Sequence, residues 1–176
     1  MPRMTSESSG SEAREWILSI AIAVALAFII KAFLFDFVLV QGTSMVPTLL
    51  DGERLIINKI GYRVTEPDYG DIVVLKHADN VDYVKRVIGK EGDQVEIKNR
   101  VVYRNGQALD EPYINSGDYD DFAKVTVPKG TYFVLGDNRP ISLDSRYDSV
   151  GFIKRADIIG KVIFRFWPFS RLGTVQ

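Results

Sequence analysis

The 176-residue sequence predicts a mostly β fold, in which a single N-terminal transmembrane helix precedes one β-rich domain. An almost uninterrupted apolar run over residues 16–35 predicts the helix. Beyond Val40 short apolar runs alternate with Gly, Asp and Asn, and this pattern predicts the strands of the domain. The length leaves room for one domain of ordinary size and little more.

The composition excludes several kinds of function. Lys and Arg number 22 and Asp and Glu 23, a formal net charge of -1, so the attraction that drives nucleic-acid binding is lacking. The chain has no cysteine, which excludes disulfides, a thiolate nucleophile and zinc sites built on sulfur. Its one histidine, His77, cannot form a multi-histidine metal site, and we interpret it as an ordinary surface residue. We therefore expect no metal, no cofactor and no nucleic-acid partner.

The apolar run has the length of one bilayer crossing. Between Trp16 and Phe35 the only charge is Lys31 and the only other polar side chain is Ser19. Twenty helical residues span about 30 Å, which matches the hydrocarbon core of a membrane. Lys31 lies near the far end, where its aliphatic stem can carry the ammonium to the headgroups. We interpret residues 16–35 as an uncleaved anchor.

Two other interpretations of this run are less consistent with it. A cleavable signal peptide needs small residues at the end of the apolar core, whereas Ala23, Ala25 and Ala27 lie inside it. A buried core helix is the other alternative, but apolar residues fall on every side of this run and form no amphipathic stripe. Basic residues flank the run on both sides, so their count leaves the orientation open.

The β-rich domain is predicted to contain at least seven strands. KNR and RNGQ are predicted turns, and Asn105-Gly106 is the better hairpin signal of the two. The acidic, turn-rich segment 110–124 is predicted to be an exposed loop. The predicted strands are Arg54–Lys59, Asp71–Lys76, Val81–Ile88, Gln94–Ile97, Val101–Arg104, Thr131–Leu135 and Ile158–Phe166.

The stretch GTSMVPT, residues 42–48, contains a candidate nucleophile, Ser44. A hydroxyl is a weak nucleophile unless a neighbouring His, Lys, carboxylate or terminal amine removes its proton. Since the chain has one histidine, a lysine becomes a serious candidate for the base. The alternative is that Ser44 caps a turn before Pro47.

Lys85 is the lysine best placed for this role. It lies in VDYVKRVIGKEGD, where strand alternation puts it on one face with Tyr83 and Val87. A free lysine has a pKa near 10.4, but apolar neighbours disfavour the ammonium and lower that pKa. The alternative is that Lys85 extends into solvent, and the spacing from Ser44 does not separate the two.

A third polar stretch, GDNRPISLDSR, residues 136–146, follows the apolar strand TYFVL directly. A polar loop at the end of a buried strand is a usual place for functional groups. Ser142 is suited to hydrogen-bond a neutral amine, and Asp144 can pair with Arg146 and fix the loop. The alternative is a solvated turn with a surface ion pair.

Taken in order, these stretches resemble those of the type I signal peptidases, membrane-bound serine proteases that remove signal peptides from exported proteins. The resemblance rests on four motifs behind an apolar segment and covers nearly the whole chain from Trp16 to Phe166. The motifs are SMVPTL at 44–49, GDIVVL at 70–75, YVKRVIGKEGD at 83–93 and GDNRPISLDSR at 136–146.

The resemblance implies a role for each matching residue. Ser44 stands where the family has its nucleophile, and Lys85 where it has its general base. Ser142 matches a hydroxyl that orients the lysine, and Asp144 and Arg146 match residues that hold the active-site loop. The backbone N–H of the nucleophile would supply one oxyanion donor.

One position departs from part of the family. Some members have Ser or Thr two residues before the nucleophile as a second oxyanion donor, whereas this chain has Gly42, as the smaller single-anchor members do. The second donor is therefore left open. In that smaller subgroup the N-terminus is cytoplasmic and the catalytic domain lies on the outer face of the cell membrane. The implied topology is a tail at 1–15, an anchor at 16–35 and an extracytoplasmic domain at 36–176.

The resemblance also implies the substrates and partners. The family cleaves after a small residue, typically Ala, with a second small residue two positions earlier, so the expected partners are signal peptides and the lipid bilayer. An extended peptide is expected to pair between residues 37–42 and 82–85. The residues that match pocket walls are Val38, Val40, Met45, Leu49, Tyr83 and Val84.

The aromatic run KVIFRFWPF near the C-terminus is interpreted in two parts. Val162 and Phe164 are expected in a buried strand, while Trp167 and Phe169 suit a membrane interface. Other functions remain open: a processing protease with a narrower target, such as a pilus-subunit or organellar one, or an anchored β domain that binds exported segments without cleaving them. A self-cleaving repressor is disfavoured because the chain lacks a DNA-binding segment.

Overall fold

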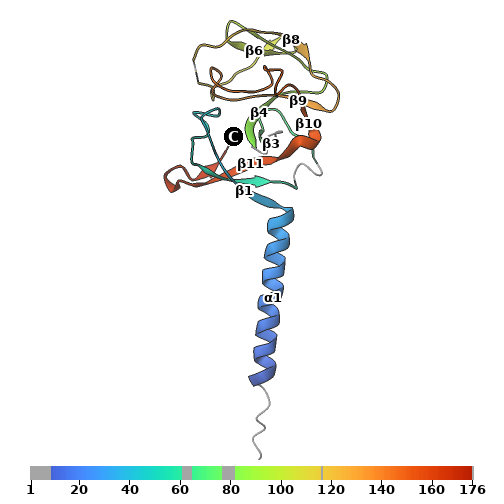
Figure 1. The fold of residues 1–176 in the computed structure, drawn as a ribbon, viewed down its shortest axis with the longest axis vertical. Helices are drawn as coiled ribbons and strands as arrows, with labels where there is room; N and C mark the ends of the chain where they lie inside the picture. The colour runs from blue at the N-terminus through green and yellow to red at the C-terminus, as the bar shows by residue number, and fades with distance from the viewer. Residues whose placement is uncertain (1–8, 61–64, 77–81, 116, 176) are drawn as a thin grey trace, which may run out of the picture.

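The computed structural model describes residues 9–60, 65–76, 82–115 and 117–175, with only the backbone given for helix residues 9–11 and 29–33. His77 lies outside the described residues. A helix, α1 (Ser9–Phe33), projects from a domain built of β-strands (Figure 1). The expected mostly β fold is therefore confirmed for the part that follows the helix.

Helix α1 contains Ala, Leu and Ile in its interior, with no Pro, and its one acidic residue in the first turn is Glu12, where the helix dipole favours a negative charge. It begins seven residues before the predicted run and ends at Phe33, two residues before that run ends. The side chains of residues 12–28 are all exposed. Among the residues whose side chains are described, no helix is long and apolar enough to cross a membrane. The transmembrane anchor stays a prediction.

The larger sheet has eight strands, and it positions the residues around Ser44, the candidate nucleophile. Seven of them run in the order β1-β2-β11-β3-β4-β9-β10, β12 pairs with β11, and every pairing is antiparallel. Their bounds are β1 (Phe35–Leu39), β2 (Arg54–Asn58), β3 (Ile72–Leu75), β4 (Tyr83–Lys90), β9 (Thr131–Leu135), β10 (Ile153–Lys154), β11 (Ile158–Trp167) and β12 (Gly173–Thr174).

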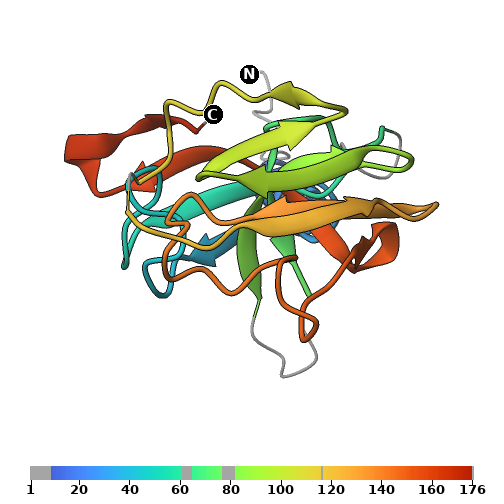
Figure 2. The same ribbon diagram turned by 90° about the horizontal axis from the view of Figure 1, so that it is seen from above.

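The smaller sheet has four strands in the order β7-β6-β5-β8, and it lies on the side of the domain away from α1 (Figure 1). Figure 2 shows the same fold from above, with the strands overlapping in layers. A buried cluster joins the two sheets: Ile88, Phe133 and Leu135 from the larger one pack with apolar residues of the smaller one. The bounds are β5 (Gln94–Lys98), β6 (Val101–Arg104), β7 (Gln107–Ala108) and β8 (Phe122–Thr126), and short 3-10 helices η1 (Arg155–Asp157) and η2 (Phe169–Arg171) lie beside β11.

All seven predicted strands are confirmed with bounds that agree within two residues over the described positions. The hairpin at Asn105-Gly106 is confirmed too: both residues have positive φ, 53° and 80°, as a tight turn between β6 and β7 requires. Val162 is buried as expected, and Phe164 is half-buried.

The prediction of an exposed loop over residues 110–124 is wrong in part. β8 begins at Phe122 and pairs with β5, and Tyr119 packs against the buried cluster between the sheets. The side chain of Glu111 is nearly inaccessible and forms an ion pair with the buried Arg139. The acidic composition of the segment gave no sign of these contacts, because the sequence does not distinguish a buried, paired carboxylate from a solvated one.

Candidate active site

Ser44 lies in a loop that follows β1, which we call the nucleophile loop (residues 42–49). The loop begins at Gly42, whose φ of 90° is rarely adopted by residues with a side chain, and whose N–H donates to Asp51 Oδ1 at 2.7 Å. Two carbonyls of the loop, those of Thr43 and Ser44, accept hydrogen bonds from the side chain and backbone of Asn138. Ser44 is therefore held in place by Asn138, a residue from a distant part of the chain.

Lys85 meets Ser44 from β4. Its Nζ donates to Ser44 Oγ at 2.9 Å and to the Val84 carbonyl at 3.1 Å. The residue is 4% exposed, because both faces of β4 are covered. The alternative in which this lysine extends into solvent is wrong. When the amine is neutral, its lone pair can instead accept a hydrogen bond from Ser44 Oγ over the same 2.9 Å.

Burial lowers the pKa of Lys85 to about 8, and the nearby Arg146 charge acts in the same direction. The negative charges of Asp144 and Asp137 act against burial and keep the pKa from falling further. At pH 7 a lysine with this pKa is neutral in about one molecule in ten, compared with one in a few thousand for a free lysine. The amine can therefore serve as a base near neutral pH.

The 136–146 loop follows β9 and presses against the nucleophile loop. A Cβ on Gly136 would come within 2.1 Å of Ser142 Oγ and 2.5 Å of the Ser44 carbonyl oxygen, so the approach requires glycine. Ser142 is buried, and its Oγ has no hydrogen-bond partner among the described residues. A buried hydroxyl without a partner is costly, which suits a group kept for a reacting amine or a substrate.

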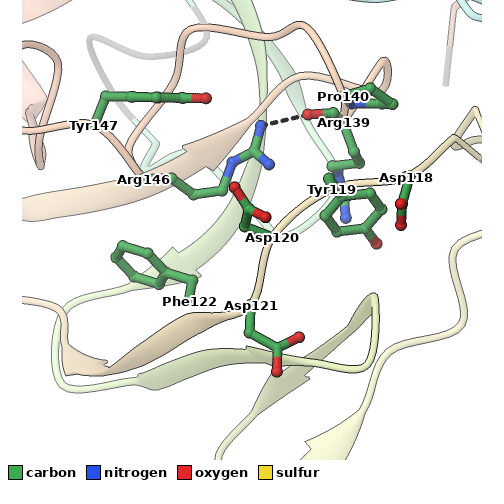
Figure 3. A pocket seen from close by; sticks show the side chains of 9 residues that line it. All are labelled: Asp118, Tyr119, Asp120, Asp121, Phe122, Arg139, Pro140, Arg146 and Tyr147. Atoms are coloured by element: carbon green, nitrogen blue, oxygen red, sulfur yellow. Dashed lines mark hydrogen bonds between the residues drawn. The ribbon is translucent and has the colours of Figure 1, made fainter.

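Asp144 and Arg146 form the ion pair that the sequence suggested, and it is buried. Arg146 Nε lies 2.8 Å from one carboxylate oxygen of Asp144 and Nη2 lies 2.9 Å from the other. Asp144 also accepts the N–H of Gly136 at 3.0 Å. The guanidinium of Arg146 reaches the Arg139 carbonyl as well, at 2.8 Å (Figure 3). The alternative of a solvated turn with a surface pair is wrong, because both partners are shielded.

Two more buried pairs fix this loop, and the sequence analysis did not identify them. Arg86 pairs with Asp137 through two contacts of 2.9 and 2.7 Å, and both side chains are buried. Arg139 pairs with Glu111 through contacts of 3.0 and 2.6 Å. Two of these residues, Asp137 and Arg139, lie in GDNR and Arg86 follows Lys85, so adjacency to the candidate site was the available signal.

Ser44 and Lys85 lie in an open pocket of about 270 Å³. Of the predicted pocket walls, Val40, Met45, Tyr83 and Val84 line it. The other two, Val38 and Leu49, are not among the lining residues; they pack in the hydrophobic core beneath. Two residues that were not predicted, Ile141 and Leu143, complete the wall, and residues 39, 41–43 and 82 line it too.

A second pocket, of about 300 Å³, lies behind the 136–146 loop, and Figure 3 draws its nine lining side chains. They include Asp118, Asp120, Asp121 and Arg146, but neither Ser44 nor Lys85. Over the described residues no group of three His, Cys, Asp or Glu side chains is placed to hold a metal ion. The first pocket, which is lined by the serine and the buried amine, is therefore the candidate active site.

A serine hydroxyl that contacts a buried amine on the floor of an open pocket is the arrangement of a serine hydrolase whose base is a lysine. The comparisons with known proteins agree. The family described as "Signal peptidase, peptidase S26" matches residues 13–167. The chain therefore belongs to this family, and it is a serine peptidase of the signal peptidase I type.

Two relatives illustrate the family. "Signal peptidase IB" of Staphylococcus aureus is 46% identical over 177 residues, which cover 90% of this chain and 92% of that protein. "Signal peptidase I" of Bacillus licheniformis is 44% identical over 183 residues, which cover 96% and 98%. A crystal structure of a signal peptidase I from Enterococcus faecalis V583 is 36% identical, covers 56% of this chain and 97% of that one, and has a TM-score of 0.49.

Proposed function

We propose that this signal peptidase cleaves N-terminal signal peptides from exported preproteins after small residues, with Ser44 as nucleophile and Lys85 as general base. The observation that supports this most directly is the 2.9 Å contact between Ser44 Oγ and a buried lysine whose pKa is lowered to about 8. Both parts are needed, since the contact gives the path for the proton and the lowered pKa gives a base at neutral pH.

In the first step neutral Lys85 takes the proton of Ser44 Oγ while the oxygen attacks the carbonyl carbon of the scissile bond. The resulting ammonium then donates this proton to the leaving amine, which departs as the mature protein's N-terminus. In the second step Lys85 takes a proton from water, which hydrolyses the acyl-serine and restores the hydroxyl. Ser142 would orient the amine, and the buried pair of Asp144 and Arg146 would hold its loop.

The oxyanion that forms in both steps needs donors, and the Ser44 N–H is the first candidate. Gly42 has no side chain to supply the second. Its positive φ makes the position unfavourable for Ser or Thr, and its own N–H is already bonded to Asp51. We therefore propose that the second donor comes from outside position 42.

The substrate would bind as an extended chain between residues 37–42 and 82–85. Val40, Met45 and Val84 are buried, and Tyr83 is half-buried, so the pocket beside Ser44 has apolar walls that are backed by the core. Such walls exclude large side chains because a packed core yields little. Small residues at the cleavage site, of the Ala-x-Ala kind, follow from this.

The decisive experiment compares wild type with Ser44→Ala on a model preprotein that carries an Ala-x-Ala site. Wild type should release a product whose new N-terminus begins after the second Ala, as sequencing would verify, and the variant should release none. Cleavage by the variant would exclude Ser44 as nucleophile. Binding of the preprotein by wild type without cleavage would favour the non-catalytic β domain, and cleavage of one kind of precursor alone would favour the narrower processing protease.

We further propose that residues 16–35 anchor the chain in the cell membrane, with residues 1–15 cytoplasmic and 36–176 outside. Exposed apolar side chains support a contact with lipid: Trp167 and Phe169 stack edge to face at 5.0 Å at the end of β11. In Figure 1 this end lies on the side of the domain from which α1 leaves. Protease added outside sealed cells should digest the domain and spare the N-terminus, and a Trp167→Ala, Phe169→Ala variant should process bilayer-embedded substrate more slowly. An unchanged rate would contradict the aromatic contact.

A further inference from the structure

A buried carboxylate outside the described chemistry, Glu53, lies between two arginines. Its Oε2 is 3.2 Å from Arg165 Nη1, and its Oε1 is 3.0 Å from Arg171 Nη1. Glu53 is almost inaccessible to solvent and precedes β2, whereas the arginines come from β11 and η2. A carboxylate removed from water is costly unless it is paired. Arg165 donates a hydrogen bond to Oε2, whereas Oε1 has no hydrogen-bond partner among the described residues, so Arg171 is held to Glu53 by charge alone.

The same two arginines donate to the backbone of the nucleophile loop. Arg165 Nη1 lies 3.1 Å from the Thr48 carbonyl, and Arg171 Nη2 lies 3.2 Å from it and 3.3 Å from the Pro47 carbonyl. Arg165 Nε also donates to the Arg171 carbonyl, which ties the two arginines together. These carbonyls are three and four residues after Ser44. Glu53, Arg165 and Arg171, which we call the Glu53 clamp, thus bind the C-terminal end of the loop.

One other restraint acts at Thr48 itself, whose Oγ1 donates to Asp137 Oδ2 at 2.5 Å, and the rest act at the start of the loop. Gly42 at its start is bonded to Asp51, and Asn138 holds the carbonyls of Thr43 and Ser44. The Glu53 clamp fixes the loop's other end from a part of the chain that does not line the pocket. None of its members is therefore in a position to touch substrate at the pocket.

We infer that the Glu53 clamp positions the nucleophile, so that Arg165, Arg171 and Glu53 are positioning residues for the cleavage reaction. The inference rests on the proposed role of Ser44. Forked guanidinium groups suit this task because one group can bond a carboxylate and a carbonyl at the same time in fixed directions. Supporting contacts of this kind matter because a displacement of about 1 Å at a reacting atom can cost roughly a hundredfold in rate.

The test compares Arg171→Ala, Arg171→Lys and Glu53→Gln with wild type and with Arg155→Ala as the matched control. Arg155 is 27% exposed against 31% for Arg171, and it also contacts one carboxylate, that of Glu66, and one backbone carbonyl. It lies beside β10, remote in the sheet order from the nucleophile loop. The full-length chain in detergent would be assayed on an Ala-x-Ala preprotein, at a temperature where circular dichroism finds every variant folded.

We expect Arg171→Ala and Glu53→Gln to lower kcat roughly tenfold to a hundredfold with KM within about twofold of wild type. Arg171→Lys should recover part of the loss, since an ammonium can reach Glu53 but not both acceptors. A kcat within about twofold of the Arg155→Ala control in both variants would overturn the inference, as would losses confined to melting temperature. If Arg171→Ala does not fold, Arg171→Lys and Glu53→Gln decide. Activity of Ser44→Ala in the same assay would instead overturn the proposed function.

Discussion

The two sheets of this peptidase contain similar charged residues and use them in opposite ways. Lys85 in β4 of the larger sheet is 4% exposed, and burial lowers its pKa to about 8. Lys98 in β5 of the smaller sheet is 60% exposed, and its hydrogen bond with Glu96 raises its pKa. The same side chain is thus the proposed base in one sheet and stays a cation in the other. Placement against the core, rather than residue type, therefore decides the direction in which the pKa of each lysine shifts.

The largest effect is expected when Lys85 is replaced by an apolar side chain that cannot accept a proton. Lys85→Met should reduce cleavage by at least about 10⁴-fold, because the serine loses its base. It should also raise the free energy of unfolding at pH 7 by up to about 3 kcal/mol, because the buried ammonium is destabilising and Met is not. Precursor cleavage and thermal unfolding in detergent measure the two changes.

The sign of the stability change can be checked through its pH dependence. Lys85 has a lower pKa folded than unfolded, so its penalty is complete below pH 8 and disappears as the pH rises toward 10.5. The advantage of Lys85→Met should shrink over that range. Lys98→Met is the control, with cleavage and stability near wild type. Equal behaviour of the two variants would mean that burial does not distinguish the lysines.

The next effect is expected at the buried ion pairs. Asp137→Asn removes the negative charge that faces Arg86 and should lower the free energy of unfolding by about 3–5 kcal/mol, because the buried guanidinium loses its carboxylate partner. Asp118→Asn breaks the exposed pair with Arg100 near the smaller sheet and should have no measurable effect. Denaturant titration of both variants gives the comparison, and similar losses would contradict it.

A smaller effect is expected when only the pH of the assay is changed. Since Lys85 must be neutral to act, kcat/KM should rise with pH, gain about tenfold from pH 7, and level off above about pH 8. A base exposed like Lys98 would give a rise that continues past pH 10. The pH–rate profile of wild type measures this directly, and a flat profile from pH 6 to 10 would exclude Lys85 as the base.

The smallest effect is expected at two glycines with positive φ, one from each sheet's surroundings. Gly42→Ala and Gly106→Ala should each cost about 1 kcal/mol of stability, because both positions are left-handed and neither Cβ would meet another atom. Only Gly42→Ala should also lower kcat, since Gly42 begins the nucleophile loop. Equal kcat values for the two variants would mean that the start of this loop tolerates adjustment.

The sequence could predict what depends on neighbouring residues. Short apolar runs bounded by turn residues located β3 and β9, and the Asn105-Gly106 pair located a hairpin, because apolar runs and turn chemistry are local properties. These local patterns did not identify β1 or β8. β1 overlaps the end of the predicted apolar run, and β8 begins inside an acidic segment. Both strands exist because a partner elsewhere in the chain pairs with them.

At the candidate site, Ser44 and Lys85 could be proposed from the shortage of histidine and the apolar alternation around the lysine. Their 2.9 Å contact could not, because it joins residues 41 positions apart through the register of the larger sheet. The Glu53 clamp was invisible for the same reason, since Arg165 and Arg171 lie more than one hundred positions from Thr48. Long-range ion pairs carry no local pattern.

The 136–146 loop is closed by three arginine–carboxylate pairs, Arg86–Asp137, Arg139–Glu111 and Arg146–Asp144, in a chain without cysteine. Ion pairs form as the chain folds and need no oxidant, whereas a disulfide in the same place would wait for one. The site can therefore assemble at any redox potential. Reducing agents should leave the 136–146 loop intact, because folding alone is enough to form its ion pairs.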